Sequence, residues 1–137
     1  MADFVHLSTL LLSRAFPAKE HHNVVPLNAF VTSLLRNCNA SVSVALLSLI
    51  LLHRLVRRLR HTASPHSHCA RRMYLASLVI ATKVHLERVP TNRAWAKLTG
   101  LPLSHINQLE AEFLALINYE SYVAPTFFAS FIRNMSL

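Results

Sequence analysis

Histidines and cysteines are the residues of this chain that most readily suggest metal chemistry. The 137 residues include nine histidines and two cysteines. Four of these side chains belong to one short segment: His61, His66, His68 and Cys69. No pair among them has the CxxC or HxxxH spacing that brings two ligands to one metal ion. We therefore expect structural or surface roles for them, and no metal site.

Acidic residues and glycine bear on whether the chain is an enzyme. The six acidic residues belong to no motif that joins a carboxylate to a nucleophile. The single glycine, Gly100, excludes a GxGxxG dinucleotide turn, a Walker-type phosphate loop, a GxSxG nucleophile elbow and a kinase glycine loop. We expect no enzymatic activity, no cofactor and no small-molecule substrate.

Positive charge is concentrated in the middle of the chain. The formal net charge is +8, and residues 21–86 contain eight Lys and Arg side chains without any Asp or Glu. The remainder has six cations and six acids, so it is neutral. Six arginines form a candidate site for an anionic partner: Arg54, Arg57, Arg58, Arg60, Arg71 and Arg72.

The ends of two predicted helices explain part of this cluster. Arg57, Arg58 and Arg60 end one helix, where cations complement the helix dipole. Arg71 and Arg72 open the next helix, where the dipole disfavours cations by roughly 0.3–1 kcal/mol each. If the two helices pack antiparallel, all five arginines crowd at one edge, and an anionic partner would relieve their repulsion. A solvated, self-repelling edge is the alternative, because exposed charges interact weakly.

Lys83 and Glu110 are isolated charges in largely apolar surroundings. Lys83 follows ten uncharged residues, 73–82, and Glu110 lies in the sequence Leu-Glu-Ala-Glu-Phe at 109–113. A lysine at a helix end can simply extend its charge to solvent, or it can be held at a partly apolar surface to bind a partner's oxygen atoms. Lone charges at helix edges are common, so local features alone favour the simpler role.

The elements that carry these residues are helices, because apolar residues recur with the helical period along most of the chain. Pro26 is predicted at the first position of a helix with Asn23 or a neighbour as its cap, Ser41 as the cap of the next helix, and Thr126 as the cap of the last. Further helices are predicted over 1–16, about 68–86, 92–99 with Gly100 after it, and from 102–104 to a break at 119–125. Residues 17–25 are predicted to be a linker and 61–67 a loop.

These elements predict an all-α domain of six or seven short helices around two unusually apolar ones. Cys38 and Cys69 fall within helical patterns, and we expect them to be reduced, as in an intracellular protein. The longest uncharged apolar stretch, 41–52, is about 18 Å long as a helix, well short of the ~30 Å membrane core. The first residues lack a basic n-region, so we expect neither a signal peptide nor a membrane span.

Two segments together resemble a cyclin box. The sequence YLASLVIATK at 74–83 is similar to its third helix, whose signature ends in Ala-Ser-Lys. The sequences NRAWAKLTGLPL at 92–103 and INQLEAEFL at 106–114 are similar to its fourth and fifth helices. These sequences resemble in particular those of the fungal cyclins of the phosphate-response (PCL/PHO) class, with plant P/U-type cyclins as relatives. The resemblance implies one box at 24–132, a five-helix orthogonal bundle around a buried central helix, with an N-terminal helix and linker at 1–23 and a tail at 133–137.

The resemblance also implies a function and a site. A cyclin is a regulatory subunit that binds a cyclin-dependent kinase, here expected to be of the PHO-system type, and activates it by holding its active-site helix inward. The family's paired lysine and glutamate, which grip kinase backbone, fall on Lys83 and Glu110. Apolar kinase contacts would fall on Val84, Leu114 and Tyr119. The expected location is the nucleus, the cytoplasm or both.

Some positions depart from the family pattern. Thr82 replaces the usual serine, and residues 84–88 replace the commoner Phe/Tyr-x-x-Asp. Residues 27–31 lack the Met-Arg-Ala-Ile-Leu sequence of cell-cycle cyclins, so their substrate-docking patch is not expected here. The alternative function is a basic, nucleic-acid-binding cyclin-like module that uses the arginines on phosphates. The sequence disfavours it because no aromatic stacking residues interleave with the arginines; an anionic membrane surface is a weaker alternative.

Overall fold

A computed structural model describes residues 2–16, 25–60 and 69–136, and these residues form seven helices and no strand. The helices are α1 (Ala2–Ala15), α2 (Leu27–Asn37), α3 (Val42–Leu59), α4 (Ala70–His85), α5 (Asn92–Thr99), α6 (Leu103–Leu116) and α7 (Pro125–Ser136). The expected all-helical class is confirmed. Among the described residues, no helix is long and apolar enough to cross a membrane.

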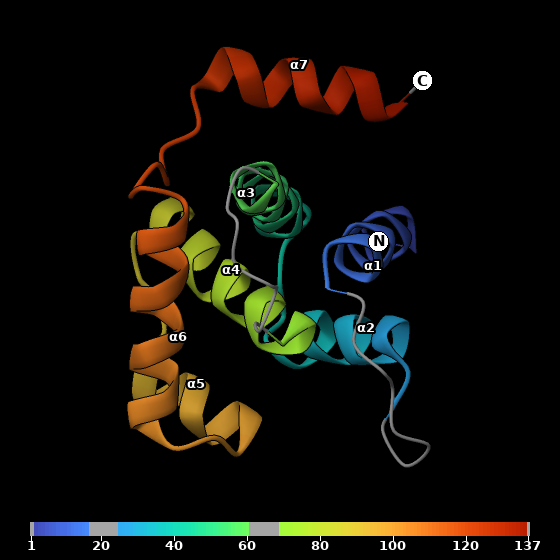
Figure 1. Ribbon diagram of the computed structural model, residues 1–137. Helices are drawn as coiled ribbons and strands as arrows, with labels where there is room; N and C mark the ends of the chain where they lie inside the picture. The colour runs from blue at the N-terminus through green and yellow to red at the C-terminus, as the bar shows by residue number, and fades with distance from the viewer. Residues whose placement is uncertain (1, 17–24, 61–68, 137) are drawn as a thin grey trace.

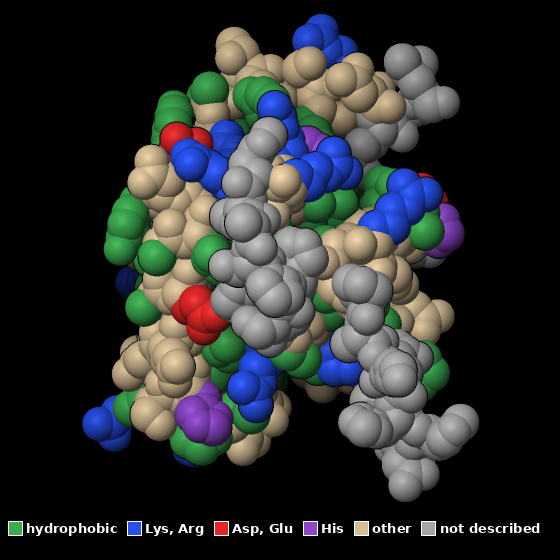
Figure 2. All heavy atoms as spheres, viewed as in Figure 1, with side chains coloured by type: hydrophobic (Ala, Val, Ile, Leu, Met, Phe, Trp, Pro, Cys, Tyr) green, Lys and Arg blue, Asp and Glu red, His purple; other side chains and the backbone are tan. Residues whose placement is uncertain are grey.

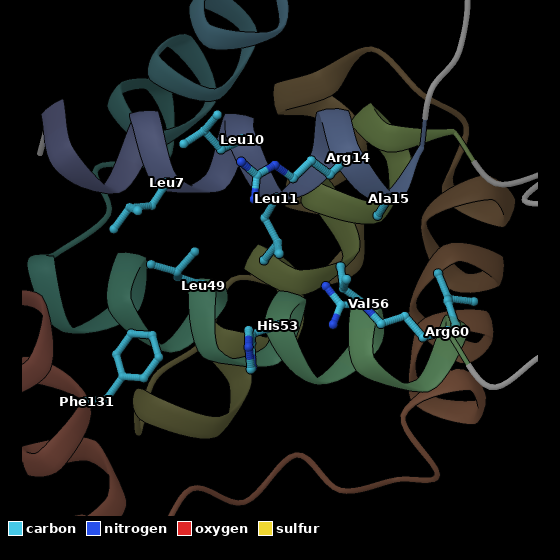
Figure 3. A pocket seen from close by; sticks show the side chains of 11 residues that line it. Leu7, Leu10, Leu11, Arg14, Ala15, Leu49, His53, Val56, Arg60 and Phe131 are labelled. Carbon is cyan, nitrogen blue, oxygen red and sulfur yellow. The ribbon is translucent and has the colours of Figure 1, made fainter.

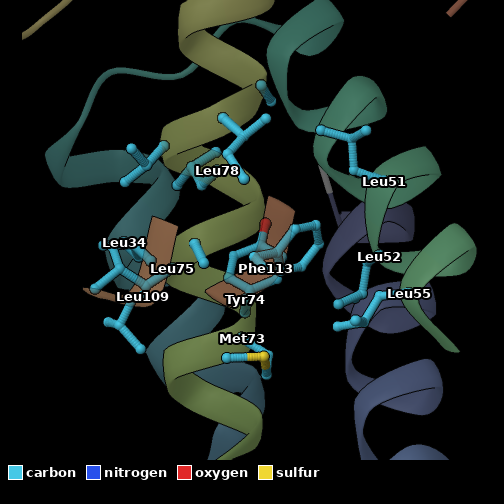
Figure 4. Packing of buried hydrophobic residues seen from close by; sticks show 14 of the residues in the cluster. Leu34, Leu51, Leu52, Leu55, Met73, Tyr74, Leu75, Leu78, Leu109 and Phe113 are labelled. Atoms are coloured by element: carbon cyan, nitrogen blue, oxygen red, sulfur yellow. The ribbon is translucent and has the colours of Figure 1, made fainter. Parts of the chain in front are cut away.

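The two most apolar helices, α3 and α4, form the centre of the bundle (Figure 1). Every residue of α4 from Met73 to Thr82 is buried, and α4 packs against α1, α2, α3 and α6. Figure 4 shows Leu51, Leu52 and Leu55 of α3 beside Tyr74 of α4 and Phe113 of α6. A helix that is apolar on all sides must be surrounded by other helices, which is the arrangement seen here.

Local sequence signals set several helix ends as predicted. The Ser41 side chain accepts a hydrogen bond from the amide of Val44 at 3.2 Å, so Ser41 caps α3. Thr91 caps α5 in the same way through the amide of Ala94, also at 3.2 Å. Gly100 ends α5 with φ +75°, in the left-handed region that glycine adopts most readily.

Other helix ends differ from the sequence prediction. Pro26 precedes α2 and no side chain of the described residues caps that helix, so α2 begins one residue later than predicted; Asn23, the predicted cap, lies outside the described residues. Helix α7 begins at Pro125, which has no amide proton to leave unpaired, so Thr126 lies inside the first turn and is not the cap. Cys38 directly follows α2 and Cys69 directly precedes α4, so neither lies within a helix. The predicted loop at 61–67 lies outside the described residues.

A buried polar cluster joins three helices inside the core. The Tyr74 hydroxyl on α4 meets the hydroxyls of Ser8 on α1 and Ser48 on α3, and all three residues are at most 1% exposed. Burial raises the pKa of Tyr74 to about 12, although the hydrogen bonds with the two serines act in the opposite direction. The cluster gives α1 a specific register on the central helices.

Candidate partner-binding site

Lys83 and Glu110 form an ion pair between α4 and α6. Lys83 lies in the last turn of α4, and Glu110 lies in α6, which packs against it. Nζ of Lys83 is 2.6 Å from Oε2 and 2.8 Å from Oε1 of Glu110. The two side chains are 33% and 17% exposed, so the pair lies at the edge of the core, still within reach of a partner.

Asn92, the first residue of α5, extends this pair into a polar network. Its Nδ2 donates to Oε1 of Glu110 at 3.0 Å and to Oδ1 of Asn107 at 2.8 Å. Its own Oδ1 is buried and has no hydrogen-bond partner among the described residues. The sequence pattern does not mark either asparagine as a site residue, because their approach to Glu110 depends on how α5 packs against α6.

The ion pair keeps some hydrogen-bonding capacity for a partner. An ammonium group has three donors, and a carboxylate has about four acceptor positions. Oε1 of Glu110 already accepts from Lys83 and Asn92, whereas Oε2 contacts Lys83 alone among the described side chains. The pair can therefore donate from Nζ to a carbonyl oxygen and accept from an amide at Oε2 while its internal contact persists.

The three apolar residues assigned by resemblance lie at different depths. Val84 is 42% exposed immediately after Lys83, and Tyr119 is 69% exposed. Leu114 lies one turn beyond Glu110 on the same side of α6 and is partly buried against the core. Exposed apolar groups beside a charge pair can bind a helix through its side chains and its neighbouring backbone through the charges.

The connection after α6 holds Tyr119 in an uncommon backbone conformation. Asn118 and Tyr119 have φ values of +56° and +60°, both in the left-handed region. The amide of Tyr119 donates to the carbonyl of Leu114 at 2.8 Å. A bulky residue rarely adopts this conformation, so surrounding contacts must stabilise it.

Arg54 on α3 makes contacts of this kind. Its Nη1 donates to the carbonyl oxygens of Glu120 at 2.8 Å and Tyr122 at 2.7 Å. Its guanidinium also lies 5.9 Å from the ring centre of Phe127 in α7. Arg58, one turn later, forms an ion pair with the Glu120 carboxylate at 3.2 Å. Both arginines thus position the connection that carries Tyr119.

The basic residues are divided between two places, which differs from the single crowded edge expected above. Arg54 and Arg58 face the connection after α6, whereas Arg71 turns to α2. Its guanidinium donates to the carbonyl of Val25 and lies 5.3 Å from the ring centre of Phe30. These contacts explain a cation in the first turn of α4, because nearby oxygen and ring electrons offset the unfavourable helix dipole.

The side chains of Arg57, Arg60 and Arg72 are exposed and make no hydrogen bond or ion pair with any described residue. Figure 2 shows several Lys and Arg side chains gathered below α7 and others at the lower edge of the same face. Burial, and then the charges of Arg57 and Arg60, lower the pKa of His53. An anionic partner for the six arginines stays a prediction. Of the predicted surface histidines, His61, His66 and His68 lie outside the described residues, within which no metal-binding group of His, Cys, Asp or Glu occurs.

A comparison with protein families decides the identity of this bundle. The Cyclin family model matches residues 5–121, which include the Lys83–Glu110 pair and both segments that resemble the cyclin box. The chain belongs to the cyclin family. Cyclins are regulatory subunits of kinases and not enzymes themselves, as the sequence predicts for this one.

Several fungal and plant cyclins are similar to this chain. G1/S-specific cyclin pas1 of Schizosaccharomyces pombe is 30% identical over 129 residues, 91% of this chain and 31% of its own length. PHO85 cyclin-1 of Saccharomyces cerevisiae is 33% identical over 107 residues, 76% of this chain and 38% of its own length. Cyclin-P4-1 of Oryza sativa subsp. japonica is 28% identical over 107 residues, 78% of this chain and 50% of its own length.

These relatives confirm the expected PCL/PHO-type resemblance and its plant relatives. The chain spans between about a third and a half of the length of these three proteins. The family match ends before α7, which begins at Pro125. The domain boundaries at 23/24 and 132/133 stay predictions.

Proposed function

We propose that this cyclin binds and activates a cyclin-dependent kinase of the PHO85 type through the surface formed by α4, α6 and the connection after α6. The observation that carries the proposal is the Lys83–Glu110 pair, because it joins the two helices at an accessible edge and keeps donor and acceptor capacity. The relatives named for PHO85 support the kinase type.

The proposed mechanism is a shift between kinase conformations. The kinase helix that bears the active-site glutamate would pack against Val84, Leu114 and Tyr119, while Lys83 and Glu110 bind the adjacent backbone. A cyclin that binds the inward position of that helix better than the outward position raises the population of the active kinase. The inward glutamate then pairs with the kinase's own lysine, which phosphoryl transfer requires.

A comparison of two double variants tests the proposed role of the ion pair. Lys83→Ala with Glu110→Ala removes both charges, whereas Lys83→Glu with Glu110→Lys keeps an ion pair and reverses its polarity. We expect each to weaken binding of a purified PHO85-type kinase at least tenfold, because partner carbonyl and amide groups then meet the wrong charge or none. Isothermal titration gives the affinity, and phosphorylation of a model peptide gives the activation.

Thermal unfolding of the same variants separates a binding role from a structural one. The reversed pair should unfold near the temperature of the unaltered protein, since its internal contact is retained. Val84→Asp should also weaken kinase binding, whereas Val42→Asp, at a 57% exposed position of α3 outside the proposed surface, should not. Full kinase activation by the folded, reversed-pair variant would refute the proposed role of Lys83 and Glu110.

A further inference from the structure

An apolar groove lies between α1, α3 and α7, away from the residues proposed to bind the kinase. The groove has a volume of about 410 Å³ and is lined by residues of those three helices, whereas Lys83, Val84, Glu110 and Leu114 belong to α4 and α6. Cavities of this size, mainly apolar with a few charged groups, are typical of binding sites.

The two ends of the groove differ in character. Figure 3 shows Leu7 of α1, Leu49 of α3 and Phe131 of α7 around one end. Arg14 of α1 and Arg60, which directly follows α3, enter the groove from the other end, with their guanidinium groups near Leu11 and Val56, and no acidic side chain lines the groove among the described residues. An occupant should therefore be apolar along most of its length and acidic at one end.

The dimensions and openness of the groove favour a helix as occupant. Leu7 to Arg14 on α1 spans about 10 Å, and Leu49 on α3 to Arg60, which directly follows that helix, spans about 16 Å, so the two distances correspond to two or three helical turns. Leu7 and Leu10 are 38% and 40% exposed, so the groove is open to solvent along α1. An amphipathic helix can bury one face there and leave its polar face in water, whereas an acyl chain would leave apolar surface exposed.

We propose that this groove docks an amphipathic helix of a partner protein, with apolar residues at i, i+3, i+4 and i+7 followed one turn later by acidic residues. The apolar residues would pack on Leu7, Leu10 and Leu49, and the acids would pair with Arg14 and Arg60. A docked substrate or regulator would thereby be brought to the cyclin without occupying the kinase-binding surface. The inference does not rest on the proposed kinase function.

Two synthetic helices test the proposal by fluorescence anisotropy, with the cyclin alone. One peptide has four leucines at the stated spacing and two glutamates one turn beyond, and the other has lysines in place of the glutamates. The glutamate peptide should bind at least tenfold more tightly. Arg14→Glu with Arg60→Glu should reverse this preference, and Leu10→Asp should weaken binding at least tenfold.

Matched surface variants serve as controls for these changes. Leu98 on α5 is as exposed as Leu10, at 40%, and lies outside the groove, so Leu98→Asp should change the affinity less than twofold. Lys83→Ala, on the other surface, should likewise leave the affinity for the peptide unchanged. Equal binding of both peptides, no binding by either, or equal losses for the Leu10 and Leu98 variants would each overturn the proposal.

Two further outcomes would assign the groove to another occupant and also overturn the proposal. One is that hexadecanoate, used below its critical micelle concentration, displaces the glutamate peptide and binds more tightly than the peptide does. That result would indicate a lipid site. Self-association in sedimentation experiments that Leu10→Asp abolishes and Leu98→Asp does not would indicate a second copy of this chain.

Discussion

The role of Lys83 depends on the group that its side chain contacts. A lysine after ten uncharged residues can extend its charge to solvent, or it can be held at a partly apolar surface to bind a partner. In the structure, its Nζ contacts both carboxylate oxygens of Glu110, and Asn92 donates to the same carboxylate. The carboxylate holds the Lys83 ammonium group in one place at the edge of the core. A charge with a fixed position can bind a partner's backbone only when the backbone oxygen atoms lie in a matching geometry.

Tyr74 provides a prediction at the scale of a single residue. Its pKa rises from 10 to about 12 on folding, so between these values the unfolded chain loses the hydroxyl proton while the folded protein keeps it. The free energy of unfolding should therefore be steady below about pH 10 and fall by on the order of 2 kcal/mol as the pH rises through about 12. Urea unfolding followed by circular dichroism between pH 8 and pH 12 measures this fall.

Substitution of the same tyrosine isolates its contribution. Tyr74→Phe should destabilise the protein by roughly 1–2 kcal/mol at neutral pH, because Ser8 and Ser48 lose a buried partner. Its free energy of unfolding should then fall less than that of the unaltered protein above pH 10. Tyr122→Phe, at a 73% exposed position, serves as the control. Parallel pH curves for the Tyr74 variant and the unaltered protein would contradict the assignment.

At the scale of an element, the connection between α6 and α7 is shaped more by a distant helix than by its own sequence. Arg54 and Arg58 on α3 bind its carbonyl and carboxylate oxygens, and Asn118 and Tyr119 adopt left-handed backbone within it. These contacts give part of the basic segment a structural role. Two of its arginines position a proposed kinase contact, so they are less available to bind phosphates.

Arg54→Ala should loosen this connection and leave the central helices intact. The charged guanidinium makes two hydrogen bonds to carbonyl oxygens, and hydrogen bonds to charged groups typically contribute about 1.5–3 kcal/mol each, less where solvent competes. We expect amide hydrogen exchange at residues 118–122 to accelerate about tenfold or more, with exchange in α4 unchanged. Arg57→Ala, at an exposed arginine of the same helix, should have no such effect. Equal exchange in the two variants would argue against a positioning role for Arg54.

At the scale of the whole molecule, the fold separates two candidate interaction surfaces. The α4–α6 surface carries the ion pair, and the groove between α1, α3 and α7 carries apolar side chains and two arginines. Helices α6 and α1, which contribute to the two surfaces, lie on opposite sides of the central helices α3 and α4 (Figure 1). Such separation would allow a regulatory subunit to bind a kinase and a second protein at the same time.

Independence of the two surfaces is the prediction at this scale. Saturating the groove with the glutamate peptide should change the kinase affinity by less than about 0.5 kcal/mol, because distant sites without shared contacts are usually additive. Kinase titrations with and without the peptide measure this coupling. Leu10→Asp should likewise leave kinase binding unchanged. Displacement of the kinase by the peptide would show that the surfaces overlap or are coupled.

The sequence by itself determined the helical class, several helix ends and the family. Apolar periodicity requires helices with one buried face, Ser41 and Gly100 end helices through local hydrogen bonding and backbone freedom, and the segments at 74–83 and 92–114 carry the cyclin pattern. These features depend on residues that are neighbours along the chain. The pairing of Lys83 with Glu110 came from the family resemblance and not from spacing.

Only the tertiary structure decided which distant polar groups meet. Asn92 reaches Glu110 because α5 packs on α6, Arg54 reaches Tyr122 across 68 positions of the chain, and Arg71 turns to α2 instead of joining the other arginines. No local pattern encodes these contacts, since each depends on the packing of helices far apart in sequence. The excess of positive charge is therefore visible in the sequence, whereas its division between structural contacts and open surface follows from the fold.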